Sequence, residues 1–257
     1  MLQLREVNYK IDSSGYPNYP FNLPIFQSLN QLVFDKPVTI FVGDNGTGKS
    51  TILESIATAG ELITIGNDFK APAFGKEITK SIKLVWNRKS RVGFYFKAND
   101  FIQFIERTKQ TKQESREAID EIDRSNLDPL AKMPHARTLY DLKQLYGDGL
   151  EFRSHGESFL DLFRSRFQAN GLYILDEPEA PLSPVNQLAL ISMMKDAIEE
   201  GAQFVLATHS PILMAFPDAK IYSLEMDSIS TVAFDDLEHV TITRDFLNNP
   251  GSFLKHL

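Results

Sequence analysis

A glycine-rich segment of eight residues constrains this chain more than any other feature of its sequence. The segment reads Gly43-Asp44-Asn45-Gly46-Thr47-Gly48-Lys49-Ser50, and it fits the pattern G-x-x-x-x-G-K-[ST] at every fixed position. In such a loop the glycines let backbone N–H groups turn toward the α- and β-phosphates of a nucleotide, while the lysine reaches the β- and γ-phosphates. The hydroxyl of Ser50 would ligate Mg²⁺, with Thr51 next to it in the chain. The pattern therefore predicts a nucleotide site formed by residues 43–51.

The segments on either side of this loop have the periodicity that the loop requires. Val38–Val42 is a short apolar run rich in β-branched residues, and Thr51–Ala57 has helical spacing. The alternative is a glycine-rich turn with a chance lysine, and the strand and helix that flank the loop argue against it. With 257 residues, 42% of them hydrophobic, the chain can bury the core of one large α/β domain, with or without a small lobe.

Composition excludes several classes of site. The chain has no cysteine, which excludes disulfides, cysteine-based zinc sites and a thiol nucleophile. Its first residues alternate like a strand, without the features of a signal peptide, and no apolar run is long enough to span a bilayer. The net charge of −7 argues against a surface that coats nucleic acid generally. We therefore expect a soluble, cytoplasmic protein that contains no membrane segment.

The positive charge is concentrated in residues 70–97. Eight basic residues there face one acid, Glu77, so that this stretch has a net charge of +7 and the rest of the chain −14; they are Lys70, Lys76, Lys80, Lys83, Arg88, Lys89, Arg91 and Lys97. Ile78–Trp86 and Val92–Phe96 are predicted to be the strands of a hairpin with a turn at 87–91. Lysines that protect a sheet edge explain this charge more simply than contact with nucleic acid, which stays an alternative for the hairpin at 76–97.

A charged helical segment follows the basic stretch. It opens with apolar residues at Phe101 and continues with interleaved acids and bases through Arg124. Prolines at 129 and 134 then interrupt the helices. The pattern predicts a solvated helix pair, because it is too short and too irregular in its heptads for a long coiled-coil arm.

Two carboxylates follow the apolar run Leu172–Leu175. A buried strand would deliver both of them to the edge of the sheet where the phosphates bind. There Asp176 can hold the Mg²⁺ shell while Glu177 polarises the attacking water, which is the division of roles that phosphoryl transfer needs. A strand that ends in Asp-Glu is common, and the phosphate loop is what makes this one informative.

Two weaker signals flank the acidic strand. Ser154 and Glu157 form a capping box that begins a helix, and the free N–H groups of such a helix end can bind an anion. An ordinary helix cap explains the same residues. The second signal is the apolar run Phe204–Ala207, which leads to His209, and Pro211 keeps this histidine out of a helix. A lone histidine is more often structural than catalytic.

The order and spacing of these four elements resemble the ATP-binding-cassette ATPases. The resemblance covers roughly residues 2–211 and is strongest with the soluble branch that includes the RecF and SMC proteins and many stand-alone ATPases with the AAA designation. It implies that residues 43–50 are the Walker A loop, residues 172–177 the Walker B strand with Glu177 as the catalytic glutamate, residues 154–158 the signature motif, residues 178–183 the D-loop and His209 the switch histidine.

This sequence departs from the family pattern at a few positions. The usual signature Ser-Gly-Gly-Gln is here Ser154-His155-Gly156-Glu157, and Ser183 stands where the D-loop often has aspartate. No clear Q-loop glutamine follows the strand at 92–96, so Gln103 is the nearest candidate and Asn99 the second. Aromatic residues that could stack on adenine lie upstream of the loop, at Tyr16, Tyr19 and Phe21.

The resemblance implies a fold and a division of the chain. We expect an α/β P-loop NTPase fold, an ABC-ATPase-like head with a mostly parallel sheet core, an antiparallel β lobe and a small helical lobe. Residues 1–257 would form a single domain, with its core at about 1–75 and 150–257. The basic hairpin and the helical lobe would be inserted at about 76–149.

The resemblance also implies a mechanism. Two subunits would clamp two ATP molecules with Mg²⁺ head to tail, each nucleotide between the loop of one chain and Ser154 and Gly156 of the other. Lys49, Glu177 and His209 would carry the hydrolysis of ATP to ADP and phosphate. The output would act on DNA, RNA or a partner protein in repair, chromosome maintenance or phage defence. The alternatives are a regulatory ATPase subunit that gates an effector protein without touching nucleic acid and, third, the nucleotide-binding subunit of a transporter.

Overall fold

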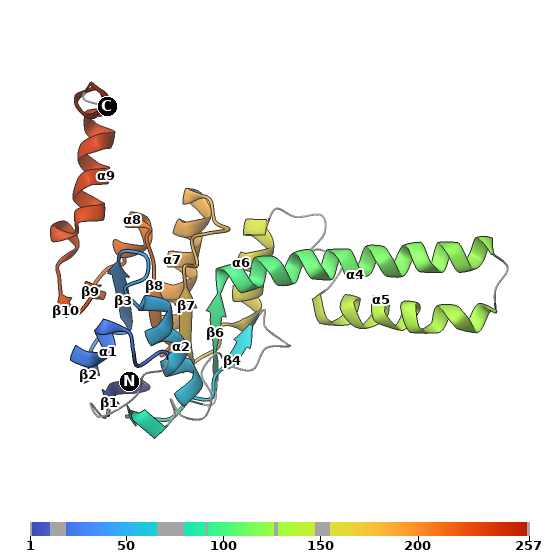
Figure 1. The fold of residues 1–257 in the computed structure, drawn as a ribbon, viewed down its shortest axis with the longest axis horizontal. Helices are drawn as coiled ribbons and strands as arrows, with labels where there is room; N and C mark the ends of the chain where they lie inside the picture. The colour runs from blue at the N-terminus through green and yellow to red at the C-terminus, as the bar shows by residue number, and fades with distance from the viewer. Residues whose placement is uncertain are drawn as a thin grey trace.

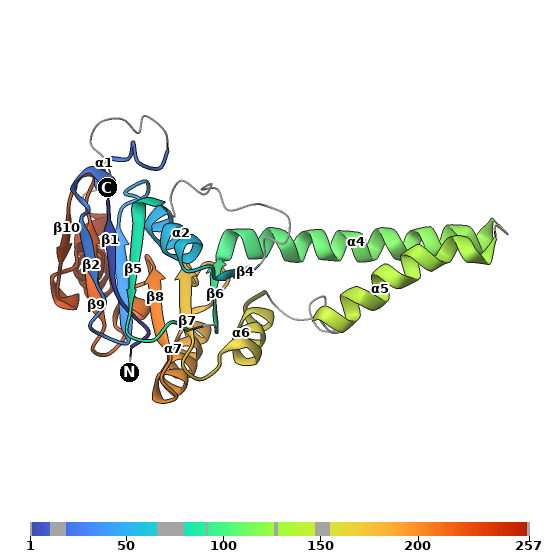
Figure 2. The same ribbon diagram turned by 90° about the horizontal axis from the view of Figure 1, so that it is seen from below.

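The molecule consists of an α/β body from which a helical hairpin projects (Figure 1). The computed structural model describes residues 2–10, 19–65, 80–90, 92–125, 128–146 and 155–255. Helices cover both faces of the main sheet, and a smaller sheet lies on one side of the body (Figure 2).

The main sheet has seven strands in the order β10-β9-β3-β8-β7-β6-β4. All neighbouring strands pair in parallel except β10 and β9, which are antiparallel. The strands are β3 (Val38–Gly43), β4 (Ile63–Ile65), β6 (Gly93–Lys97), β7 (Leu172–Asp176), β8 (Gln203–Ala207), β9 (Lys220–Leu224) and β10 (Ile229–Thr231). Every residue of β7 and β8 is buried, as expected for strands that are covered on both faces. The predicted P-loop NTPase fold with a mostly parallel sheet is confirmed.

The smaller sheet is antiparallel, with the order β2-β1-β5. Its strands are β1 (Leu4–Tyr9), β2 (Gln31–Val33) and β5 (Ile82–Trp86). The buried side chain of Gln203 joins it to the main sheet, since its Oε1 accepts from the backbone N–H groups of Gln3 and Leu4 at 3.0 and 2.8 Å and its Nε2 donates to the Leu4 carbonyl at 2.9 Å. The expected antiparallel lobe is therefore present, but it is built largely from the N-terminus.

The hairpin predicted over 78–96 is wrong. Strand β5 pairs with β1, whereas β6 pairs with β4 and β7 in the other sheet. The physical reason lies in the apolar side chains of β6, because the successive residues Phe94, Tyr95 and Phe96 are all buried and need cover on both faces. A hairpin with one solvated face would have exposed part of this run. Of the basic residues predicted for this hairpin, Lys83 thus lies on an edge strand, Lys80 just before it, and Arg88 and Lys89 in the loop after it, whereas Lys76 and Arg91 lie outside the described residues.

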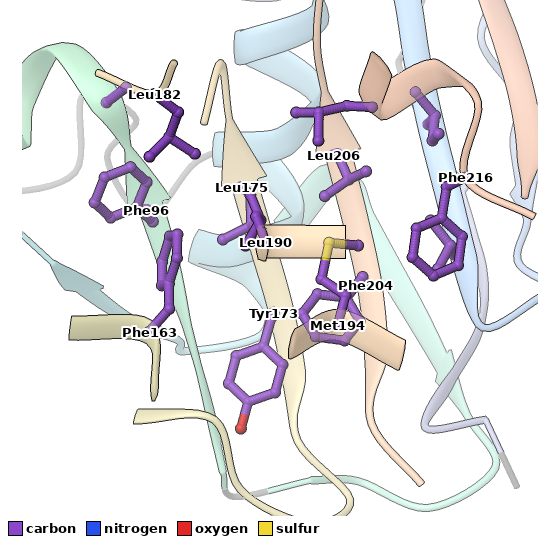
Figure 3. Packing of buried hydrophobic residues seen from close by; sticks show 14 of the residues in the cluster. Phe96, Phe163, Tyr173, Leu175, Leu182, Leu190, Met194, Phe204, Leu206 and Phe216 are labelled. Atoms are coloured by element: carbon purple, nitrogen blue, oxygen red, sulfur yellow. The ribbon is translucent and has the colours of Figure 1, made fainter. Parts of the chain in front are cut away.

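Two hydrophobic cores lie on opposite faces of the main sheet. One core packs α6 (His155–Arg166) and α7 (Pro184–Glu199) on the sheet, with the ring of Phe163 near Phe96, the side chain of Leu190 beside Leu175 and that of Met194 over Phe204 (Figure 3). The other core packs α1 (Pro24–Ser28), α2 (Lys49–Ala59) and the antiparallel sheet. Alternate residues of β3 belong to different cores, with Ile40 in the first and Phe41 in the second.

The projecting hairpin is formed by α4 (Ala98–Arg124) and α5 (Met133–Tyr146), with a short 3₁₀ turn at Pro129–Lys132 between them (Figures 1 and 2). The two helices pack on each other, so the predicted helix pair is present. Near the C-terminus, α8 (Pro211–Met214) is followed by α9 (Glu238–Asn248) and α10 (Pro250–Leu254). Within the described part of the chain, no helix combines the length and the apolar character needed to cross a bilayer.

Candidate functional site

The predicted site residues gather where three parallel strands end. Strand β8 lies between β3 and β7, and Ala207 at its end is in register with Phe41 on one side and with Asp176 on the other. Carboxyl ends of parallel strands share one edge of a sheet, where ligands of open α/β folds bind. The loop after β3, the acidic pair after β7 and the histidine after β8 therefore meet at this edge.

Two glycines of the loop occupy positions that no other residue fits well. Gly43 has φ +141°, and a Cβ atom built on it would lie 2.2 Å from the backbone oxygen of Leu224 in β9. Gly48 has φ +99° as it begins α2, and its Cβ would lie 2.9 Å from Cγ2 of Ile25. Both positions combine a close approach with a backbone conformation that favours glycine. The loop is thus shaped by contacts to α1 and β9 as well as by its own sequence.

Lys49 lies in the first turn of α2 and is buried. Its ammonium group donates to the carbonyl oxygens of Gly43 at 2.7 Å and Asp44 at 2.8 Å. Burial lowers the pKa of Lys49, and the negative charges of Glu177 and Asp176 act in the opposite direction. The ammonium is thus held against the loop by two carbonyl oxygens. The negative charges of Asp176 and Glu177 partly compensate its positive charge.

Ser50 and Asp176 form a direct link between the loop and the acidic strand. The Ser50 hydroxyl donates to Oδ1 of Asp176 at 3.1 Å, and the Tyr95 hydroxyl donates to Oδ2 at 3.3 Å. Asp176 is buried, and burial raises its pKa to about 6 although both hydrogen bonds and Lys97 favour the ionised form. A buried carboxylate beside a hydroxyl offers the hard oxygen ligands that Mg²⁺ prefers, so the residues present fit that ion.

Glu177 and His209 face each other across the edge of the sheet. Glu177 has φ +51°, rare for a residue with a side chain, and its N–H donates to the Ala207 carbonyl at 2.9 Å. Its Oε1 lies 4.0 Å from Nε2 of His209. Burial lowers the pKa of His209, and the positive charge of Lys49 adds to this effect, so both favour the neutral imidazole. Nε2 of His209 is buried and has no hydrogen-bond partner among the described residues.

The other predicted site residues are placed as follows. Asn45, Gly46 and Thr47 complete the loop, and the Thr47 hydroxyl donates to the Asp44 carbonyl at 2.9 Å. Ser154 lies outside the described residues. Gly156 lies in the first turn of α6, which begins at His155, one residue after the predicted cap. The roles of both in a second subunit's site stay predictions.

The candidates for adenine contact and for the Q-loop differ in their exposure to solvent. Phe21 is buried in the core beside α1, whereas Tyr19 is 56% exposed and its hydroxyl lies 2.9 Å from Oγ1 of Thr51. Tyr16 lies outside the described residues. Asn99 and Gln103 are both exposed in the first turns of α4, and Asn99 is the nearer to β6, whose Lys97 is in register with Asp176.

Sequence reasoning missed three polar residues around this edge. Tyr95 reaches Asp176 from the neighbouring strand, Glu179 accepts a hydrogen bond from the backbone of His209, and Gln187 contacts Ser210. Tyr95 sits inside an apolar run, and Glu179 and Gln187 carry no motif of their own. Only the pairing of β6 with β7 and the packing of α7 bring them to the site.

The chain is similar to several known proteins. The AAA domain family AAA_23 matches residues 22–145. The cobalt import ATP-binding protein CbiO of Salmonella typhimurium is 22% identical over 241 residues, which are 88% of this chain and 84% of that protein. The energy-coupling factor transporter ATP-binding protein EcfA2 of Streptococcus agalactiae is 26% identical over 239 residues, 89% of this chain and 79% of that protein. The SMC head domain from Thermotoga maritima aligns at a TM-score of 0.42 and 15% identity over 90% of this chain and all of that one.

Proposed function

Since this chain is an ABC-type P-loop ATPase, we propose that it binds ATP with Mg²⁺ and hydrolyses it to ADP and phosphate. The observation that carries this proposal is the contact of Ser50 with Asp176, because it joins the phosphate loop to the acidic strand at the edge where Glu177 and His209 also lie. These groups come from three segments of the chain, which are the start of α2, the end of β7 and the loop after β8.

The phosphates would lie against the loop and the N-terminus of α2. Lys49 would exchange the carbonyl oxygens of Gly43 and Asp44 for β- and γ-phosphate oxygens, which bind an ammonium more strongly because they are charged. The free N–H groups at the start of α2 add a favourable field for the anion. Ser50 and Asp176 would hold the Mg²⁺ ion, which when bound neutralises charge on the phosphates.

The attacking water would lie near Glu177. This carboxylate is partly exposed at the edge of the site, so it can accept a hydrogen bond from water and orient it toward the γ-phosphate. The lowered pKa of His209 favours a neutral imidazole, whose Nε2 lies 4.0 Å from Oε1 of Glu177. It can therefore donate or accept a hydrogen bond there without adding a positive charge beside Lys49.

The proposed active form is a head-to-tail homodimer. The helix end at Ser154 and Gly156 would come from a second copy and close over the γ-phosphate, so that ATP binding joins the two copies and hydrolysis separates them. In this arrangement ATP acts as a switch whose state is read by another molecule.

The first test is the steady-state release of phosphate from ATP by the purified chain, with and without Mg²⁺. We expect Mg²⁺-dependent turnover that a Glu177→Gln variant lowers at least ~100-fold while it still binds ATP. An Asp120→Asn variant, on the exposed surface of α4, serves as the matched carboxylate control and should keep wild-type turnover. Equal turnover in wild type and Glu177→Gln would contradict the proposed role of Glu177.

The proposed output is the gating of a partner protein through the α4–α5 hairpin. Helix α4 begins at Ala98, directly after β6, whose Lys97 is in register with Asp176, so a shift of Asp176 would reach the base of the hairpin through β6. Leu130 and Met133 are 71% and 64% exposed at its far end. A pull-down from the native host, with and without ATP, should recover a partner with the wild-type chain and lose it with the double variant Leu130→Ser, Met133→Ser.

A second candidate output, in repair, chromosome maintenance or phage defence, is contact with DNA or RNA. It is favoured by the exposed basic residues on and around the edge strand β5, which are Lys80, Lys83, Arg88 and Lys89. Each neutralised phosphate lowers log K by about 0.9 per decade of salt. A triple variant of Lys83, Arg88 and Lys89 to Gln should therefore flatten the salt dependence of duplex binding by roughly two to three units and leave ATP turnover intact. No binding at low salt would exclude this candidate.

A third candidate output is transport. It is favoured by the names of two relatives, CbiO, a cobalt import ATP-binding protein, and EcfA2, an energy-coupling factor transporter ATP-binding protein. The pull-down described above also tests it, because a membrane-embedded partner should then be recovered with the wild-type chain.

A further inference from the structure

A buried polar network links the loop after β7 to the loop after β8. Oε1 of Glu179 accepts a hydrogen bond from the backbone N–H of His209 at 2.6 Å, and the Thr208 side chain bonds to the same carboxylate. Thirty residues separate Glu179 from His209 in the chain. The contact thus fixes the histidine by its main chain and not by its imidazole, which lies beside His239.

Gln187 makes a second connection between the same two loops. It lies in the first turns of α7 and is 8% exposed. Its Oε1 accepts from the Ser210 hydroxyl at 2.5 Å, and its Nε2 donates to the Leu182 carbonyl at 3.1 Å. The segment 208–210 is thereby held at two points by residues that follow the acidic strand.

Hydrogen bonds to the Glu179 carboxyl group oppose the effect of its burial. Burial raises the pKa of this carboxyl group, and the N–H of His209, the Thr208 side chain and the N–H of Glu179 itself oppose that effect by hydrogen bonding to the ionised form. Hydrogen bonds to a charged acceptor are about twice as strong as neutral ones. Oε2 of Glu179 is buried and has no partner among the described residues, so the interactions of the carboxylate are concentrated on the segment 208–209.

Glu179 also belongs to a tight turn that starts at Glu177. The N–H of Ala180 donates to the Glu177 carbonyl at 3.1 Å, and the N–H of Leu182 donates to the Glu179 carbonyl at 2.8 Å. Glu177 is in the left-handed region at φ +51°, a conformation that persists only where the surroundings hold it. A displacement of Glu179 would therefore move the main chain of Glu177 and that of His209 relative to each other.

We propose that Glu179 is a positioning residue for ATP hydrolysis, which sets the distance between the Glu177 carboxylate and the His209 imidazole by binding the main chain of the histidine. Gln187 assists it by holding Ser210. The inference rests on the proposed hydrolysis of ATP and assigns part of its rate to the geometry of two loops. Neither Glu179 nor Gln187 needs to touch the nucleotide.

The test compares Glu179→Ala with Glu179→Gln in steady-state ATP hydrolysis. The amide oxygen of glutamine can accept the same N–H group, whereas alanine cannot. We expect Glu179→Ala to lower kcat by ~10- to 100-fold, the scale of a misplaced reacting group, with KM for ATP changed less than ~3-fold. Glu179→Gln should restore kcat to within ~3-fold of wild type. Glu199→Ala, at an exposed position near the end of α7, is the matched control and should leave both constants unchanged.

The possible outcomes separate this inference from the proposed function. Wild-type kcat in Glu179→Ala would overturn the positioning role alone, as would a Glu179→Gln variant that is as slow as Glu179→Ala. Absence of hydrolysis by the wild-type chain would overturn both the proposed function and this inference. If Glu179→Ala does not fold, Gln187→Leu gives the second measurement. It keeps the side-chain volume and should lower kcat at constant KM, and an unchanged kcat there would also count against the proposal.

Discussion

The Ser50 hydroxyl donates a hydrogen bond to Oδ1 of Asp176 at 3.1 Å, although 126 residues of chain separate the two. The carboxylate is held from the other side by the Tyr95 hydroxyl, so its position is set by β6 and by α2 together. This arrangement has a thermodynamic cost. Burial raises the pKa of Asp176 to about 6, which means that the ionised form is less stable in the folded protein than in the unfolded chain.

The sign of that shift leads to the first prediction, on stability. The folded state binds the Asp176 proton more tightly than the unfolded state, so this group favours folding below about pH 4 and loses that contribution as the pH rises to about 6. Asp176→Asn should therefore raise the unfolding free energy of the nucleotide-free protein at pH 7.5, by at most ~3 kcal/mol. Urea unfolding at pH 7.5 measures it. A variant that is less stable than wild type at that pH would contradict the prediction, and Asp120→Asn should change little.

The second prediction concerns nucleotide affinity. Lys49→Ala removes the ammonium that we assign to the β- and γ-phosphates, and charge-assisted hydrogen bonds of this kind contribute ~1.5–3 kcal/mol each. The affinity for ATP with Mg²⁺ should fall at least ~100-fold, as measured by calorimetric titration. Lys195→Ala, at an exposed position on α7, should bind like wild type. Equal affinity of wild type and Lys49→Ala would exclude residues 43–50 as the phosphate site.

Oligomeric state provides the third prediction. Glu177→Gln with ATP and Mg²⁺ should accumulate as a dimer, because slow hydrolysis prolongs the closed state. Adding Ser154→Arg should return it to the monomer, since the larger side chain would occupy the position assigned to the γ-phosphate of the other subunit. Light scattering after size exclusion gives the mass. One mass in all conditions, whatever the nucleotide, would leave a nucleotide-binding protein without the clamp.

The fourth prediction compares two glycines of the same loop. An alanine at Gly43 would place its Cβ 2.2 Å from the Leu224 oxygen, whereas an alanine at Gly46 would meet nothing within 4 Å. Gly46→Ala should lower the free energy of unfolding by only ~1–2 kcal/mol, which is the cost of a left-handed backbone conformation for a residue with a side chain. Gly43→Ala adds a clash with the backbone of β9 and should be destabilised by clearly more than that in urea unfolding. A similar loss of unfolding free energy in both variants would show that the contact with β9 does not determine the shape of the loop.

The sequence predicted the strand, loop and helix around the glycine-rich segment and the strand before Asp176, but not the pairing of the strands β5 and β6. The phosphate loop and the strand before Asp176 are local patterns, and the structure places both where the pattern expects them. The prediction of a hairpin was wrong because β5 and β6 follow each other in sequence but differ in how far their side chains are buried. β6 is an inner strand between β4 and β7, and its partners are set by the packing of Phe94 and Phe96 against α6. Nothing within the local sequence encodes that packing.

The same limit applies to the loop contacts. Glu179 and Gln187 would pass as ordinary polar residues on a surface, because their partners His209 and Ser210 lie more than twenty residues away. Tyr95 likewise looks like a core aromatic until its hydroxyl is seen at Asp176. Side chains of this kind are recognised only once the order of the strands is known.

The strand order has a consequence for the synthesis of the chain on the ribosome. β3 leads into the phosphate loop near the beginning of the chain, yet both of its neighbours, β8 and β9, come from residues 203–224. Until those residues have left the exit tunnel, both edges of β3 lack their partners and the contact of Gly43 with Leu224 cannot form. A nascent chain released before residue 203 would therefore carry an intact glycine-rich motif without the sheet that shapes it.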